Sequence, residues 1–238
     1  NVDSSVRAIV DYLENDWTDG ENSLELPVQV TEPEGSAEDL AYVKDLLGSF
    51  TTSFSTSGAD RSKNVNSGAK HVNGTVLYPG ETFSMYETVA PFTAENGYAM
   101  AGSYLNGEVV DSMGGGICQV STTLYNAVLR AELEVVERSP HSMTVHYVEL
   151  SEDAAIAGTY KDFKFKNSTE YPIYIEGYTT SDKKITFNIY GKETRDSNRS
   201  ISFESVLVNE VKPNTILRDD AGQGLGYKSV SAGKTGYV

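Results

Sequence analysis

The stretch that decides the fold is Gly114 to Ala131, GGGICQVSTTLYNAVLRA. Its three consecutive glycines permit close backbone approach at a cost in conformational entropy, so we expect an ordered site that uses them. Beyond the glycines, apolar residues recur at helical spacing and place Val120, Leu124 and Val128 on one stripe. The pattern predicts a helix that packs on a core through this stripe and carries Cys118 at its N-terminus.

Cys118 is the one cysteine of the chain, so it cannot form an internal disulfide. At the start of the predicted helix, residues 119–131, unpaired backbone N–H groups and the positive end of the helix dipole stabilise a thiolate. The same N–H groups can bind the oxyanion that forms during acyl transfer. A glycine-flanked cysteine at a helix start therefore indicates a nucleophile, and an inert, packed thiol is the alternative.

A cysteine nucleophile needs a base, and the chain has three histidines: His71, His141 and His146. The segment 141–147 reads as a strand that follows the cysteine helix. Since His141 and His146 are five residues apart, a regular strand points them to opposite faces, and only one can face Cys118. His71 falls at the end of a predicted helix, where the dipole favours a solvent-facing histidine.

Two aspartates, Asp153 and Asp162, follow these histidines, and either can orient an imidazole as the third member of a triad. A metal site is not favoured, because one cysteine and scattered histidines match no familiar ligand spacing. We therefore expect no metal and no other cofactor.

The rest of the chain predicts an α+β fold, with the cysteine helix packed on a mainly antiparallel sheet that includes the 141–147 segment. The last two predicted strands flank the polar turn 179–183 and form a hairpin. Helices are predicted at 3–13, 36–47 and 60–71, and strands at 24–30, 76–78, 82–85, 162–167, 171–175 and 185–189.

The composition is that of a globular protein of 238 residues, with 39% hydrophobic residues and 15 tyrosines. Acidic residues outnumber basic residues by 34 to 19, and the net charge of −15 repels nucleic acid and anionic lipid. No apolar run approaches the roughly 18 to 20 residues that cross a bilayer. We therefore expect neither nucleic acid nor direct membrane contact. The abrupt ends of the chain suggest that it belongs to a longer protein.

Six further motifs accompany the 114–127 stretch: Asn73-Gly74-Thr75-Val76, Pro79 to Ser84, Glu95 to Tyr98, Glu137-Arg138, Pro140-His141-Ser142 and Asp162 to Asn167. Together they resemble the motifs of the VanW family of bacterial cell-envelope proteins. The resemblance covers roughly Leu46 to Gly191. The segment before it resembles the end of a peptidoglycan-binding domain, and the segment after it resembles the lead-in to a small glycine-rich wall-associated domain. We therefore expect three parts, at 1–47, 48–192 and 193–238.

Some VanW-family members are L,D-transpeptidases, which cross-link peptidoglycan stem peptides through a cysteine acyl-enzyme. The resemblance implies this activity here, with Cys118 as nucleophile and His141, in the Pro-His-Ser motif, as base. We take Asp153 as the third catalytic residue, stem peptides as partners, and a monomer. The implied location is extracytoplasmic, in the cell wall or anchored to the membrane through a segment outside this chain. The expected oxyanion- and substrate-binding residues are Gly115, Gly116, Gln119, Ser121, Thr122, Arg138 and Ser142.

Two other classes of function stay open. A cysteine endopeptidase or carboxypeptidase that acts on wall peptides uses the same residues in the same roles, with water as the acceptor. The other class is a non-catalytic peptidoglycan-binding module linked to glycopeptide resistance. In such a module Cys118 is only a packed structural residue. Alkylation of the folded protein near neutral pH separates an exposed nucleophile from an inert thiol.

Overall fold

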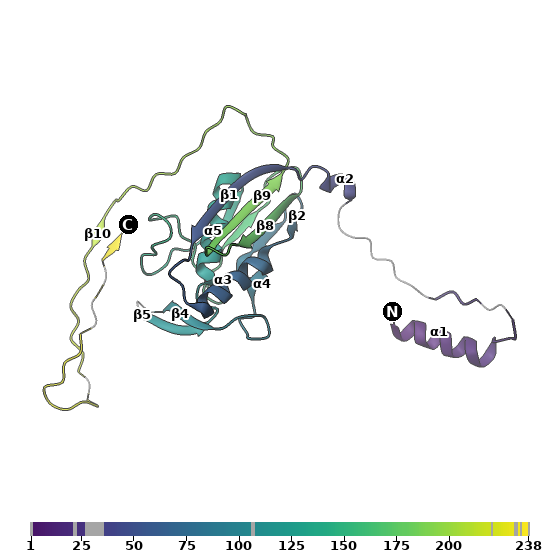
Figure 1. The fold of residues 1–238 in the computed structure, drawn as a ribbon, viewed down its shortest axis with the longest axis horizontal. Helices are drawn as coiled ribbons and strands as arrows, with labels where there is room; N and C mark the ends of the chain where they lie inside the picture. The colour runs from purple at the N-terminus through teal and green to yellow at the C-terminus, as the bar shows by residue number, and fades with distance from the viewer. Residues whose placement is uncertain are drawn as a thin grey trace. The chain divides into compact units, whose positions relative to one another are not determined.

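The computed structural model describes residues 2–20, 23–26, 36–105, 108–219, 221–230, 233 and 235–237 (Figure 1). The chain divides into two compact units, Asn1–Ser36 and Ala37–Val238, and each is described by itself. No helix among these described residues is long and apolar enough to span a bilayer.

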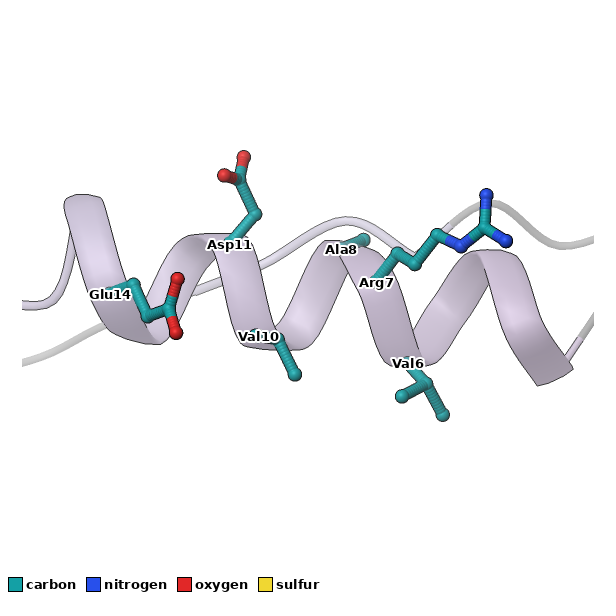
Figure 2. A pocket seen from close by; sticks show the side chains of 6 residues that line it. All are labelled: Val6, Arg7, Ala8, Val10, Asp11 and Glu14. Atoms are coloured by element: carbon teal, nitrogen blue, oxygen red, sulfur yellow. The ribbon is translucent and has the colours of Figure 1, made fainter.

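The first unit contains α1 (Val2–Asn15), which confirms the helix predicted at 3–13. Figure 2 shows Val6 and Val10 on one side of α1, with Arg7 and Asp11 on the other. A shallow surface hollow along α1 is lined by residues of this helix alone. Residues 23–26 have no regular secondary structure, and the rest of the strand predicted at 24–30 lies outside the described residues.

The core of the second unit is an antiparallel sheet in the order β1-β9-β8-β2 (Figure 1). β8 (Ile173–Thr179) and β9 (Lys184–Gly191) form the predicted hairpin. β1 (Asp45–Ser53) pairs with β9, and β2 (Thr75–Leu77) pairs with β8. The alternating apolar residues of the hairpin are fully buried, because they form the face of the sheet that the helices cover; they are Ile173, Ile175, Ile185, Phe187 and Ile189.

Two helices pack against this sheet. α3 (Ala59–Val72) contacts β8, and α5 (Ile117–Ala131) contacts β1, β9 and α3. The apolar stripe of α5 is fully buried. Gly48 lets β1 approach α5 closely, since a Cβ at Gly48 would lie 2.4 Å from the Ala127 carbonyl oxygen. The helices and antiparallel sheets confirm the predicted α+β fold.

Smaller elements surround this core. A three-stranded sheet runs in the order β3-β7-β6, and a separate hairpin of β4 and β5 leads directly into Gly114. The remaining bounds are α2 (Ala37–Leu40), β3 (Thr82–Ser84), α4 (Met85–Val89), β4 (Met100–Leu105), β5 (Glu108–Met113), β6 (Glu134–Glu137), β7 (Lys164–Lys166), β10 (Glu210–Val211) and β11 (Gly236–Tyr237).

The helix predicted at 36–47 is wrong beyond its first turn. α2 ends at Leu40, and β1 begins at Asp45, so the strand crosses the position where we expected a boundary between 47 and 48. Pairing of β1 with β9 and burial of Leu47 outweigh the local capping signal, because they supply both backbone hydrogen bonds and core contacts.

The strand predicted at 141–147 is also wrong, and the main sheet does not include it. No neighbouring strand of the described residues pairs with this segment. Its backbone and that of the adjoining residues form hydrogen bonds with a side chain and with a loop instead. The His141 N–H donates to the Asp153 carboxylate, and the Ala155 N–H donates to the Ser139 carbonyl. Alternation of apolar and polar residues persists there, since Met143 and Val145 are buried and His146 is exposed.

The residues after 193 are mostly irregular and exposed. The two short strands β10 and β11 pair with each other near the end of the chain. The sequence at 231–238 resembles a glycine-punctuated pair of strands, and residues 231, 232, 234 and 238 of it lie outside the described residues.

Candidate active site

A glycine turn sets the position of Cys118, the second residue of α5. Gly114 and Gly116 have φ angles of 80° and 110°, in the left-handed region that favours glycine. Between them, a Cβ on Gly115 would lie 2.2 Å from the carbonyl oxygen of Ala101. The three glycines are therefore required for the turn that leads β5 into α5.

Three polar side chains lie four residues apart on one face of α5 and hold the 152–156 segment beside the helix. The Cys118 Sγ donates to the Ile156 carbonyl at 3.4 Å. The Thr122 hydroxyl accepts from the Ala154 N–H at 3.0 Å, and the Asn126 amide donates to the Glu152 carbonyl at 2.7 Å. Because residues at this spacing share a helix face, the three contacts form a ladder along α5. This ladder holds Asp153 in place beside the helix.

Asp153 binds His141 and Arg138. The His141 Nδ1 lies 2.6 Å from one carboxylate oxygen of Asp153, and the His141 backbone N–H donates to the same oxygen at 2.6 Å. The Arg138 guanidinium donates to the other oxygen at 2.9 Å. Burial raises the pKa of Asp153, but these partners outweigh it and hold the pKa below its ordinary value.

His141 connects Asp153 to Cys118. Its side chain is 6% exposed, and burial alone lowers its pKa, but hydrogen bonds to Asp153 and Cys118 and their negative charges raise the pKa to about 9. At neutral pH the His141 ring is therefore an imidazolium that faces the Asp153 carboxylate. The second alternative for the third member, Asp162, instead binds Ser84 and the Tyr86 N–H at the start of α4.

The other two histidines lie elsewhere. His146 is exposed. His71 is not the solvent-facing residue that we expected, because its ring nitrogens bind the Ser67 carbonyl at 2.7 Å and the Asn96 side chain at 3.1 Å. Its ring also stacks on Tyr98, at 5.7 Å between centroids.

Several residues expected to bind substrate are engaged inside the protein. The Gln119 side chain is buried and donates to Thr52 and to the Ser53 carbonyl, while it accepts from Arg61 at 2.8 Å. Thr122 holds the 152–156 segment. Arg138 holds Asp153, with its guanidinium 5.5 Å from the centre of the Tyr125 ring. These side chains support the site rather than face solvent.

Ser121 and Ser142 differ from that group. Ser121 is fully buried, and its hydroxyl has no hydrogen-bond partner among the described residues. Ser142 is exposed, next to His141. In the part of the chain that the structure describes, no cluster of three or more His, Cys, Asp or Glu side chains could hold a metal ion.

Sequence reasoning missed Asn126, Arg61 and Tyr147. The signal for Asn126 is its spacing of four residues from Thr122 and eight from Cys118, which places all three on one face of α5. Arg61 packs on Gly116 and donates to Ser57 and Gln119. Tyr147 is partly buried. Burial and then the charge of Cys118 raise the pKa of Tyr147, so its phenol stays protonated at neutral pH.

The chain matches the family model for VanW like proteins over residues 60–190, more than half of its length. It is 39% identical over 157 residues to the "Uncharacterized protein YoaR" of Bacillus subtilis (strain 168), covering 66% of this chain and 52% of that protein. It is 31% identical over 134 residues to the "Vancomycin B-type resistance protein VanW" of Enterococcus faecalis (strain ATCC 700802 / V583), covering 53% and 48%. The chain thus spans about half the length of each relative, and no solved structure matches it. The chain belongs to the VanW family.

Proposed function

We propose that this chain is a peptidoglycan L,D-transpeptidase that works through an acyl-enzyme on Cys118. The observation that supports this most is His141, whose Nδ1 lies 2.6 Å from Asp153 and whose pKa is raised by both Asp153 and Cys118. A cysteine nucleophile, an imidazole and an orienting carboxylate in this order are the parts that acyl transfer requires. The printed name of one relative links that protein to vancomycin resistance, and we extend a role in the cell wall to this chain.

In the first step, the Cys118 thiolate attacks the carbonyl carbon between the third residue of a donor stem peptide and its terminal D-Ala. The carbonyl π electrons move to oxygen and return when the C–N bond breaks. D-Ala leaves as an amine that takes its proton from the His141 imidazolium, and a thioester remains on Cys118. The raised pKa of His141 suits this step, because the ring carries the required proton at neutral pH.

In the second step, the side-chain amine of a diamino acid on an acceptor stem attacks the thioester. Neutral His141 takes the proton that the amine loses, the C–S bond breaks, and the thiolate is restored. Asp153 keeps Nδ1 of His141 protonated and leaves Nε2 for these transfers. The net charge of −15 suits an ammonium-bearing acceptor.

Water in place of the amine makes the same site a carboxypeptidase, and cleavage inside a peptide makes it an endopeptidase. The test incubates purified muropeptides with the wild-type protein and a Cys118→Ala variant. A transpeptidase gives cross-linked dimers, a carboxypeptidase gives trimmed tripeptides without dimers, and an endopeptidase gives shorter fragments. Identical products from wild type and Cys118→Ala would exclude an enzyme and favour a binding module.

His141→Gln and His146→Gln form a matched pair for this assay. The imidazole of His141 contacts Cys118 and Asp153, while His146 is exposed five residues away. We expect His141→Gln to lose product formation and His146→Gln to retain it.

We further propose that the protein acts as a monomer outside the cytoplasm, where stem peptides are its partners. Sedimentation of the purified chain tests the first part, and protease accessibility in intact cells tests the second.

A further inference from the structure

Asn64 is a fully buried polar side chain on α3, and its hydrogen bonds go to backbone atoms in and beside the glycine turn. Its side-chain oxygen accepts from the Ala99 N–H at 2.7 Å, which identifies the other end of the amide as the nitrogen. That nitrogen donates to the Ala99 carbonyl at 3.0 Å and to the Gly115 carbonyl at 2.9 Å. Asn64 therefore ties α3 to the peptide that joins Gly115 to Gly116.

The Gly115–Gly116 peptide has little orientation preference of its own, because glycine on either side lets the peptide unit rotate with little steric resistance. The peptide is trans and planar, so its N–H points opposite to its C=O. The hydrogen bond from Asn64 holds the Gly115 carbonyl toward α3 and thereby turns the Gly116 N–H away from α3. The N–H groups on either side, of Gly115 and Ile117, donate to carbonyls of the turn. In the described part of the chain, no hydrogen bond engages the Gly116 N–H.

The side of α5 that faces away from α3 is the side that carries Cys118. α3 meets α5 at Ile117 and Val120, since a Cβ on Gly68 of α3 would lie 2.7 and 3.1 Å from their side chains. Cys118 instead lies on the face that carries the ladder. At about 100° of rotation for each residue, these two faces lie on opposite sides of the helix. An N–H of Gly116 that points away from α3 is therefore directed toward the side where the sulfur lies.

We propose that Asn64 is a positioning residue for acyl transfer on Cys118. It holds the Gly115–Gly116 peptide so that the Gly116 N–H donates a hydrogen bond to the oxyanion. This inference rests on the proposed acyl-transfer function. The sulfur lone pair forms the S–C bond and the carbonyl π pair moves to oxygen, where the N–H binds it without transferring its proton. The pair then reforms the carbonyl, and the leaving group departs with the electrons of its bond. Without Asn64 the peptide can rotate and present its carbonyl, which repels an oxyanion.

The test compares two reactions of Cys118 in the wild-type protein and in Asn64→Ala. Acylation by p-nitrophenyl acetate passes through an oxyanion, and its p-nitrophenolate leaves without needing a proton. Alkylation by iodoacetamide forms no oxyanion and reports the reactivity and exposure of the thiol. Since removal of an oxyanion donor costs about 100-fold or more, and Asn64→Ala only releases the donor, we expect acylation to slow by at least about 10-fold. Alkylation should be unchanged.

Asn167→Ala is the matched control, because Asn167 is equally buried and has the same kinds of bonds. Its amide nitrogen donates to the Leu77 and Tyr171 carbonyls at 2.9 and 2.8 Å, and its oxygen accepts from the Thr169 N–H at 3.0 Å. Asn167→Ala should therefore lose stability in urea as Asn64→Ala does, but it should change neither rate. An equal loss of both reactions in Asn64→Ala, no loss of acylation, or the same selective loss in Asn167→Ala would overturn the inference.

If Asn64→Ala does not fold, Asn64→Ser takes its place, with Asn167→Ser as its control. The shorter hydroxyl fills part of the space but does not reach the Gly115 carbonyl, so the same selective loss of acylation is expected, and its absence would overturn the inference. Since p-nitrophenyl acetate contains no wall peptide, a failure of this test is distinct from a failure of the muropeptide assay. A wild-type protein that p-nitrophenyl acetate does not acylate at Cys118 would overturn both proposals.

Discussion

The titration of His141 is the sharpest test of the site, because one group reports on both of its partners. Its pKa of about 9 lies well above the ordinary value of 6.5. At about 1.4 kcal/mol for each pH unit, the difference corresponds to an environment that favours the imidazolium by roughly 3 kcal/mol. Burial acts in the opposite direction, so Asp153 and Cys118 together must supply more than this amount.

Asp153→Asn removes one of the two negative partners and keeps the shape of the side chain. The carboxylate lies 2.6 Å from His141 Nδ1, and an opposite charge this close shifts a pKa by about one to three units. We expect the pKa of His141 to fall by about one to two units in Asp153→Asn. Cys118→Ala should lower it as well, because it removes the other partner.

Two-dimensional NMR of the histidine side chains between pH 5 and 10 measures these values, and His146→Gln assigns the second signal of the 141–147 segment. Since the folded pKa is raised, the stability from the charged pair is fully present below pH 6.5 and is lost as the pH rises through about 9. The difference in free energy of unfolding between wild type and Asp153→Asn, measured in urea, should therefore be largest near pH 6 and shrink as the pH rises through about 9. The part that comes from Arg138 and the His141 backbone N–H remains above that pH. A wild-type pKa near 6.5, or equal pKa values in wild type and Asp153→Asn, would refute this account.

Three further predictions follow from named contacts. His141→Gln should lower muropeptide turnover by about 100-fold or more, the typical contribution of a general acid–base group, and turnover equal to that of His146→Gln would contradict its role. Gly48→Ala should lower the free energy of unfolding by about 1–3 kcal/mol in urea titrations, because its Cβ would overlap the backbone of α5. Gly58→Ala, with open space around the new Cβ, is its control, and equal stabilities would contradict the packing. Asn126→Ala should cost about 1–3 kcal/mol, because it leaves a partly buried carbonyl without its donor, and unchanged unfolding would show that the ladder is not needed.

The sequence by itself determined the elements whose signals are local. Apolar residues at helical spacing predicted a helix at 119–131, and α5 spans Ile117–Ala131. Alternation predicted the hairpin of β8 and β9, which the structure contains. These predictions succeeded because residues close together in the sequence set the periodicity of a helix or strand and decide which side chains share a face.

The contacts of Asp153 and Asp162 become visible only after folding: Asp153 binds His141 and Arg138, and Asp162 binds Ser84. Asp153 reaches His141 because three side chains of α5 hold the 152–156 segment against the helix, a contact between residues about 26 to 38 positions apart. The same kind of distant contact, the pairing of β1 with β9, turned a predicted helix into a strand. Such contacts form between segments that are far apart in the sequence. Local periodicity describes each segment separately, so it cannot predict which segments pack together.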